Sequence, residues 1–244
     1  MVNLNQLILL ACSLPVKLSL GSLLLLKKFC LTGGAGTKEL ELSNPKLLHF
    51  QCMTREAITV NLSAVPNLIT LKHSVDSTGI RYVFTHVSQN HPMLRTLTVY
   101  SRCDWVQHIP ESITIFSNIQ NLELALIGNT SFDILKMISI LKAFPCLVSF
   151  SLVTTCSKDE EGKLQPNEYI YEHLKYVKLA GFYGTPNQIE FAKYLLKNAL
   201  ILERLVIKQE EAFVRKRPSW DEGERQMVIE TLQEFSKEVM LIVK

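Results

Sequence analysis

Apolar residues recur along the chain in one short pattern, L-x-x-L-x-L, in which any large apolar residue can take a leucine position. Successive copies begin 22, 21, 21, 26, 25, 28, 27 and 28 residues apart, which is too regular for chance even in a chain with 38 leucines. Because successive side chains of a strand point to opposite faces, each copy predicts a short strand that buries its leucine positions. In the fourth copy His73 takes a position that is apolar in the others. The nine copies are Leu4/Leu7/Leu9, Leu26/Phe29/Leu31, Leu47/Phe50/Cys52, Leu68/Leu71/His73, Leu94/Leu97/Val99, Ile119/Leu122/Leu124, Leu147/Phe150/Leu152, Leu174/Val177/Leu179 and Leu202/Leu205/Ile207.

This spacing is typical of leucine-rich repeats, which run about 20 to 29 residues. Parallel strands stack about 4.8 Å apart, whereas helices on the opposite side need about 10 Å each, so the stack bends with its strands on the concave face. No repeat buries its apolar face alone, and each depends on its neighbours. The pattern therefore predicts an α/β fold: a leucine-rich-repeat solenoid with a curved parallel β-sheet, and with extended segments and helices on the convex side.

The length of each repeat indicates what fills the convex side. The short repeats leave little room for a helix, and residues 58–62 alternate with period two, as an extended segment does. Residues 80–87 and 134–141, in the longer repeats, place apolar side chains at i, i+3, i+4 and i+7, which predicts helices. Short motifs with proline, such as residues 44–46, precede several strands and fix an extended approach to them.

The last third of the chain predicts an α/β cap. Residues 185–188 form a capping box with proline at the first helical position, so a helix should run to about Ala199. We expect a second capping box at residues 219–222, and residues 239–243 read as a last strand. A repeat array needs such a cap to cover its open core.

Four segments of this region closely resemble the FBD domain, which closes many plant F-box/leucine-rich-repeat proteins. The segments are His173-Leu174-Lys175, Gly181-Phe182-Tyr183-Gly184-Thr185, residues 189–199 and residues 202–207. The resemblance covers about residues 165–244, and it implies a repeat array over 1–164 followed by an FBD-like C-terminal cap over 165–244.

The resemblance implies the substrate-recognition part of an F-box ubiquitin-ligase receptor. In that family an N-terminal F-box docks on a Skp-type adaptor and the repeats select the target. Nothing in residues 1–244 resembles an F-box, so we expect a lone protein-binding module without stable adaptor binding. Two alternatives stay open: the chain is a fragment of a full-length substrate adaptor whose F-box is encoded upstream, or it is the inactive product of a degenerate gene.

Composition and charge exclude several classes of protein. Hydrophobic residues make up 47% and charged residues 20%, which indicates a globular chain rather than a disordered one. The formal net charge of +3 is too small for a nucleic-acid footprint. Residues 1–16 are uncharged but lack the basic start of a signal peptide, and Pro15 and Lys17 interrupt any membrane span, so we expect a buried repeat there and no membrane partner.

The cysteine spacings fit no zinc pattern, and we expect six reduced thiols that are buried as small apolar groups. Reduced thiols favour a cytoplasmic or nuclear location. The six cysteines are Cys12, Cys30, Cys52, Cys103, Cys146 and Cys156.

Features that suggest chemistry do not meet its requirements. Residues 32–38 are rich in glycine, but Thr37 separates Gly36 from Lys38, so the phosphate-binding Gly-Lys-Ser/Thr sequence is missing. His86 and His91 are five residues apart, yet no cluster of carboxylates converges with them. We therefore expect no enzyme activity, no cofactor and no metal.

The third, fifth and seventh positions of each repeat alternate with the buried ones and should line the concave face. We expect this face to bind an unidentified protein, with Tyr100 and Tyr176 as its strongest contacts. Basic side chains outnumber Glu123 there, which favours an acidic partner segment. The candidate binding residues are His49, Gln51, Thr70, Lys72, Thr98, Tyr100, Glu123, Tyr176, Lys178, Arg204 and Lys208.

Overall fold

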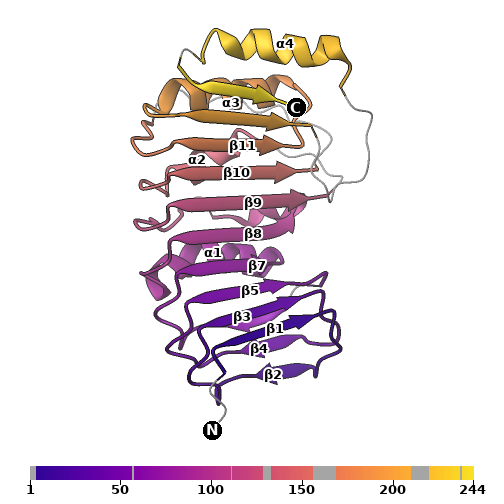
Figure 1. Cartoon of the computed structure of the whole chain (residues 1–244), viewed down its shortest axis with the longest axis vertical. Coiled ribbons are helices and arrows are strands. Elements are labelled where there is room, and N and C mark those ends of the chain that lie inside the picture. Colours follow the sequence, from indigo (N-terminus) through magenta and orange to yellow (C-terminus); the bar gives the residue numbers. More distant parts are fainter. Residues whose placement is uncertain are drawn as a thin grey trace. The chain divides into compact units, whose positions relative to one another are not determined.

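The computed structural model describes residues 4–56, 58–110, 112–128, 133–155, 169–209, 220–236 and 238–244. The chain divides into two compact units: unit 1 comprises residues 1–101 and 105–114, and unit 2 comprises residues 102–104 and 115–244. Figure 1 shows the strands and helices of each unit along the sequence. The predicted boundary between residues 164 and 165 lies outside the described residues and stays a prediction.

Unit 1 contains two parallel sheets. The larger one has the strand order β1-β3-β5-β7-β8, and the smaller one has the order β2-β4-β6. A helix, α1, follows β7, and the residues of the 3-10 helix Cys103–His108 from 105 onward also belong to this unit. The elements are β1 (Gln6–Leu10), β2 (Lys17–Ser19), β3 (Lys28–Thr32), β4 (Glu39–Glu41), β5 (His49–Met53), β6 (Thr59–Asn61), β7 (Thr70–Ser74), α1 (Ser77–Asn90) and β8 (Thr96–Arg102).

Unit 2 contains the parallel strand order β9-β10-β11-β12-β13, with the helices α2, α3 and α4 between strands. Figure 1 shows α4 beside β13, the last strand of this unit. The elements are β9 (Asn121–Ile127), α2 (Lys136–Leu141), β10 (Ser149–Thr154), β11 (Tyr176–Ala180), α3 (Pro186–Asn198), β12 (Arg204–Lys208), α4 (Glu222–Gln233) and β13 (Met240–Val243).

The strands follow the L-x-x-L-x-L pattern, and their leucine positions form the core of each unit. From the second repeat onward every apolar member of the pattern is buried, and Phe29, Leu97 and Leu205 have no exposed surface. The pairing keeps this register, because Phe29 lies opposite Phe50 and Leu97 lies opposite Leu71. Only in the first repeat are the leucines partly exposed. The leucine-rich-repeat fold class is therefore confirmed.

The outer elements change with repeat length, as predicted. The short repeats have the three-residue strands β2, β4 and β6, whereas α1 follows in the first longer repeat. Asp76 begins α1 because its carboxylate accepts a hydrogen bond from the Gly79 N–H, 2.7 Å away. The second predicted helix is shorter than the pattern suggested, since α2 is confined to Lys136–Leu141.

The C-terminal elements match their predicted positions, with one correction. Thr185 is the N-cap of α3, and the side-chain carbonyl of Gln188 accepts hydrogen bonds from the backbone N–H groups of Thr185 and Tyr183. The prediction of a capping box at residues 219–222 is wrong. Asp221 is the N-cap of α4, and it exchanges hydrogen bonds with Glu224. The aspartate takes this role because its short carboxylate reaches the third N–H of the helix. Ser219 lies outside the described residues.

A turn after β11 requires glycine. Gly181 has a φ of +75°, and a Cβ at this position would lie 1.6 Å from the carbonyl oxygen of Thr154. Only glycine avoids this clash and adopts the left-handed conformation without strain. Phe182 follows at once and is buried, with its ring edge-on to Trp220. Phe182 is therefore a core residue.

The proline motifs that precede strands also connect neighbouring repeats. The Asn44 side-chain amide donates hydrogen bonds to the Leu20 and Leu23 carbonyls, at 3.2 and 2.6 Å. Asn67 donates to the Pro45 carbonyl, 2.9 Å away, and ring nitrogen Nδ1 of His91 lies 3.0 Å from the Val65 carbonyl. The two residues of each contact are 21 to 26 positions apart in the sequence, which is the length of one repeat. They satisfy backbone carbonyls that face the preceding repeat.

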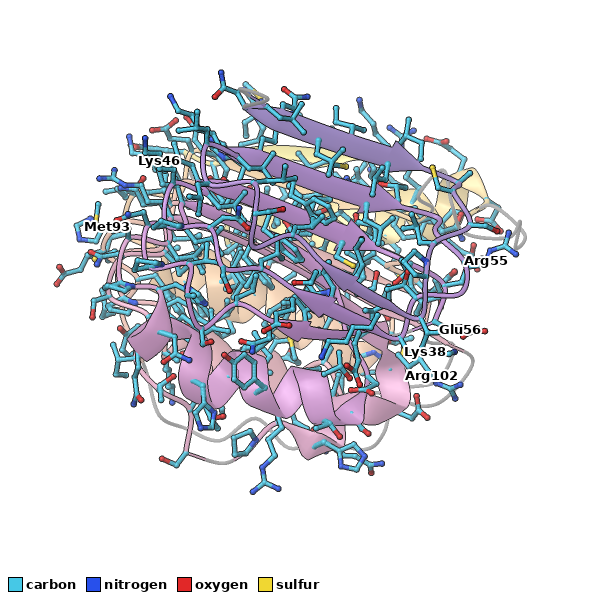
Figure 2. The ribbon with its side chains drawn as sticks, turned by 90° about the horizontal axis from the view of Figure 1, so that it is seen from below. Lys38, Lys46, Arg55, Glu56, Met93 and Arg102 are labelled. Atoms are coloured by element: carbon cyan, nitrogen blue, oxygen red, sulfur yellow. The ribbon has the colours of Figure 1, made fainter. Side chains whose placement is uncertain are left out.

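Figure 2 places Lys46 and Met93, which precede the strands β5 and β8, at one edge of unit 1 and Arg55 and Glu56 at the opposite edge. Parallel strands that begin at one edge and end at the other require this arrangement. At the second edge Lys38 forms an exposed ion pair with Glu56, and its hydrogen bond lowers the pKa of that carboxylate. Such an exposed pair adds little to stability.

The prediction of six reduced thiols is wrong for Cys103, which is disulfide-bonded. Cys12, Cys30, Cys52 and Cys146 are free, so the partner of Cys103 lies outside the described residues. Cys156 also lies outside them. The spacing of cysteines in the sequence cannot reveal such a pair, because it depends on which turns lie close together.

His73 is the one polar residue at a leucine position of the repeats. Its ring nitrogen Nδ1 lies 3.3 Å from the Cys52 carbonyl on the neighbouring strand. Since a carbonyl only accepts hydrogen bonds, Nδ1 carries the proton of the neutral ring. Burial lowers the pKa of His73 from 6.5 to about 4.

We predict that Asn44→Ala lowers the free energy of unfolding by about 2 kcal/mol, because it removes two hydrogen bonds and the packing of a side chain that has no exposed surface. Asn67→Ala is the matched control: this asparagine is exposed and makes one such bond, so its loss should cost less than about 1 kcal/mol. Urea denaturation of both variants measures the difference. Equal losses would show that the asparagine contacts do not connect the repeats in this way.

We predict that deleting residues 219–244 reduces solubility and lowers the melting temperature. The deletion removes β13 and α4, and it uncovers Leu205 and Ile207, which have no exposed surface in the intact chain. Capless repeat arrays lose solubility for this reason. Met227→Ala, on the exposed side of α4, should change neither property. A truncated chain that stays soluble and keeps its melting temperature would contradict the assignment of these residues as a cap.

We predict that stability falls as the pH drops from about 6.5 to about 4. In this range the unfolded chain binds a proton at His73 that the folded chain does not bind, so the loss can reach about 3 kcal/mol. His73→Leu should reduce the dependence of stability on pH. It should not abolish it, because burial also lowers the pKa of His91. Urea denaturation at pH 7 and pH 4.5 measures the loss of stability in the original chain and in His73→Leu. Equal losses in the two would contradict the role of His73.

Candidate protein-binding site

In each unit, the strand residues that alternate with the core form the strand face. In unit 1 the pairing aligns Lys28, His49, Thr70 and Thr96 in one row, and Cys30, Gln51, Lys72 and Thr98 in the next. In unit 2 it aligns Asn121, Ser149, Tyr176, Arg204 and Met240, and beside them Glu123, Ser151, Lys178, Val206 and Ile242. All the predicted site residues therefore lie on a strand face, six in unit 1 and five in unit 2.

The face of unit 1 is polar, and its side chains bond to one another. Nδ1 of His49 lies 3.1 Å from the Thr70 hydroxyl, and the Gln51 amide donates to the Thr32 hydroxyl at 3.4 Å. Lys72 and Tyr100 are partly exposed. Thr98 is 1% exposed, so its prediction as a contact residue is wrong: although it lies on the face, it is buried.

The face of unit 2 presents three large side chains in register. Tyr176 on β11 lies opposite Arg204 on β12, and Arg204 lies opposite Met240 on β13. The exposed fractions are 40% for Tyr176 and 55% for Met240, and Arg204 is also exposed. Tyrosine, arginine and methionine are enriched in protein interfaces, because they offer contact area together with hydrogen bonds or adaptable shape.

Glu203 fixes the orientation of Tyr176. The Tyr176 hydroxyl donates to one Glu203 oxygen and the Lys175 ammonium donates to the other, both at 2.8 Å. The hydrogen bond from Lys175, and then that from Tyr176, lower the pKa of Glu203. The same carboxylate raises the pKa of Tyr176. The phenol ring is thus held outward before any partner arrives, which reduces the entropy lost on binding.

The other predicted residues of unit 2 are less accessible. Glu123, Lys178 and Lys208 are partly exposed. The seventh positions Ala125 and Ala180, which were expected to line the open face, are buried. The accessible part of this face is therefore centred on the beginning of the strands, where Tyr176, Arg204 and Met240 lie.

Sequence reasoning missed Met240. The last strand was predicted, but it lacks the L-x-x-L-x-L pattern, so the sequence did not show which of its residues face outward. Only its pairing with β12, which aligns Met240 with Arg204, reveals this.

Across the described ranges, no three histidine, cysteine, aspartate or glutamate side chains lie where they could hold a metal ion together. None of the helices described above is both long and apolar enough to cross a membrane. The glycine-rich segment 32–38 connects β3 with β4, and Gly33 and Gly36 have positive φ angles.

Comparison with known proteins agrees with the leucine-rich-repeat fold. No curated protein and no solved structure matches the chain. One family, described as At1g61320/AtMIF1, LRR domain, matches residues 1–244. Because this match spans the whole chain, the protein belongs to the At1g61320/AtMIF1 leucine-rich-repeat domain family.

Proposed function

We propose that this chain is a protein-binding leucine-rich-repeat module whose main contact surface is the strand face of unit 2. Leucine-rich-repeat domains are in general protein-interaction modules rather than enzymes. The observation that carries the proposal is the exposed, in-register row of Tyr176, Arg204 and Met240. Tyrosine and arginine provide most of the binding energy in many interfaces.

The charge of the strand faces favours an acidic partner segment. Arg204 and Lys208 lie on the same strand, β12, in the face of unit 2, and Lys28 on β3 and Lys72 on β7 lie in the face of unit 1. The nearby acid Glu203 is already paired with Lys175, so it repels an acidic partner less. Complementary charge accelerates association and selects among partners more than it adds affinity.

The resemblance of residues 173–207 to the FBD domain supports a finer proposal: the module recognises a substrate for a plant F-box ubiquitin ligase. A fragment of a longer substrate adaptor and an inactive gene product are the alternatives. An in-frame F-box encoded upstream of Met1 would favour the adaptor. A stable complex of this chain alone with a Skp-type adaptor at micromolar concentration would contradict the lone binding module.

We propose a cytoplasmic or nuclear location, and four free cysteines support it. The disulfide at Cys103 argues against this location, since reducing compartments disfavour such bonds. Thiol counting on protein extracted under alkylating conditions would decide between them: six alkylated cysteines support the proposal, and four contradict it.

We predict that Tyr176→Ala weakens binding by about 2 kcal/mol, or roughly thirtyfold, once affinity purification with this chain has identified a partner. Tyr176→Phe should cost less, because the ring stays while the hydrogen bond to Glu203 is lost. Titration calorimetry with the purified partner measures both effects.

Leu200→Ala is the matched control, since Leu200 is 66% exposed and lies in the turn between α3 and β12 rather than on the strand face. It should leave the affinity unchanged. Tyr100→Ala tests the corresponding surface of unit 1. If both tyrosine variants bind like the original chain while Leu200→Ala binds more weakly, the partner docks outside the strand faces.

A further inference from the structure

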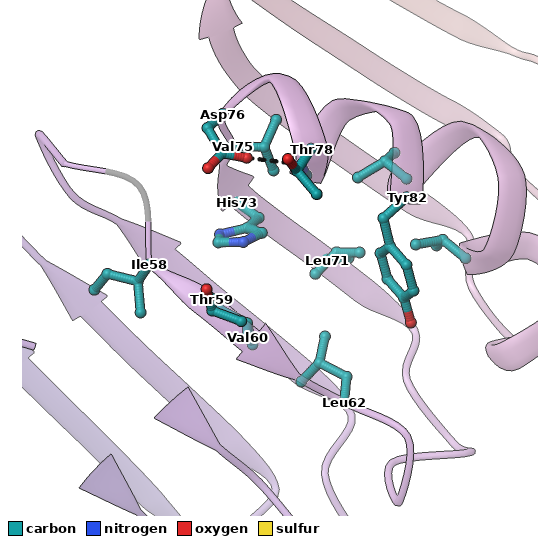
Figure 3. A pocket seen from close by; sticks show the side chains of 13 residues that line it. Ile58, Thr59, Val60, Leu62, Leu71, His73, Val75, Asp76, Thr78 and Tyr82 are labelled. Carbon is teal, nitrogen blue, oxygen red and sulfur yellow. Dashed lines mark hydrogen bonds between the residues drawn. The ribbon is translucent and has the colours of Figure 1, made fainter. Parts of the chain in front are cut away.

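Unit 1 contains a cavity of about 240 Å³ between the strand β6 and the helix α1. Figure 3 shows its wall, with Ile58, Val60 and Leu62 along the β6 segment and Tyr82 on α1. β6 is the last strand of the small sheet β2-β4-β6. The cavity lies at the place where the short repeats, with outer strands, give way to the longer repeats, with outer helices.

The wall of the cavity is mostly apolar. Leu62, Leu71, Val83 and Val87 are buried core residues that also line it. Apolar cavities of about 150 Å³ in other proteins bind benzene-sized molecules. A space of this size therefore accommodates one aromatic ring with small substituents.

His73 is the polar group at the centre of this wall. It occupies the leucine position where the other repeats bury apolar side chains, and it keeps part of its surface accessible. Nδ1 is used by the Cys52 carbonyl. The second ring nitrogen, Nε2, makes no hydrogen bond to any described residue, and in the neutral ring it carries a lone pair that can accept one.

The other polar groups restrict the charge of a ligand. Asp76 also lines the cavity, and its carboxylate accepts the hydrogen bond of the Gly79 N–H as the cap of α1. An anion would be repelled by this carboxylate. A cation would lose its hydration in this mostly apolar space. A neutral ligand avoids both costs.

We propose that this cavity binds a small, uncharged, mostly apolar molecule with one hydroxyl or amino hydrogen, which it donates to Nε2 of His73. The apolar part of the ligand lies against Leu62, Leu71, Val83 and Val87. The polar residue at a leucine position thus serves recognition rather than packing. The site lies in unit 1 and is separate from the proposed protein-binding face of unit 2.

The probes for the test are 4-fluorophenol and fluorobenzene, which differ only in the hydroxyl group. Fluorine NMR titration of the intact chain should show saturable binding of 4-fluorophenol in about the millimolar range or tighter. Fluorobenzene should bind about fivefold more weakly, because it leaves Nε2 without a hydrogen bond. In His73→Leu this preference should disappear, and in the control His173→Gln, an exposed histidine of unit 2 outside the strand face, it should persist.

A second measurement uses the original chain alone and does not depend on the folding of a variant. Bound 4-fluorophenol should give nuclear Overhauser contacts to the methyl groups of Leu62, Leu71, Val83 and Val87. The absence of these contacts, the absence of saturable binding at about 10 mM, or a phenol preference that survives His73→Leu would each overturn the proposal.

Discussion

The burial of apolar side chains between successive repeats is the interaction on which both units depend. Each strand supplies two or three such side chains, and they are covered by the strands before and after it, as Phe50 is by its stacked neighbour Phe29. The polar contacts follow from this arrangement, since Asn44 can reach the Leu20 and Leu23 carbonyls only when the repeats keep their register. The strand face exists for the same reason, because alternate residues must point away from the core.

The length of each repeat determines whether a strand or a helix lies opposite the main strands. The short repeats leave room for β2, β4 and β6, and the longer ones contain helices. Where the two types meet, the cavity beside His73 lies between β6 and α1. A single histidine in a leucine position thus marks the change of outer structure within unit 1.

The strands, their buried positions and α1 and α3 could be predicted, because periodicity and caps are local properties of the sequence. Other features could not. Asp221 rather than Ser219 caps α4, since both residues suit the role and only the helix path selects one. Thr98 is buried on a face expected to be open, and Met240 is exposed in a strand without the repeat pattern. Exposure depends on neighbouring strands that the local sequence does not specify.

The proposed function depends on a preorganised surface at the beginning of three strands of unit 2. Glu203 holds Tyr176, and the strand pairing aligns it with Arg204 and Met240. The most direct measurement replaces Met240 with a photo-crosslinking benzoylphenylalanine and compares it with the same replacement at Leu200, which is at least as exposed but lies off the face. The account predicts that the partner is captured from position 240 and not from position 200. Capture from position 200 alone would contradict it.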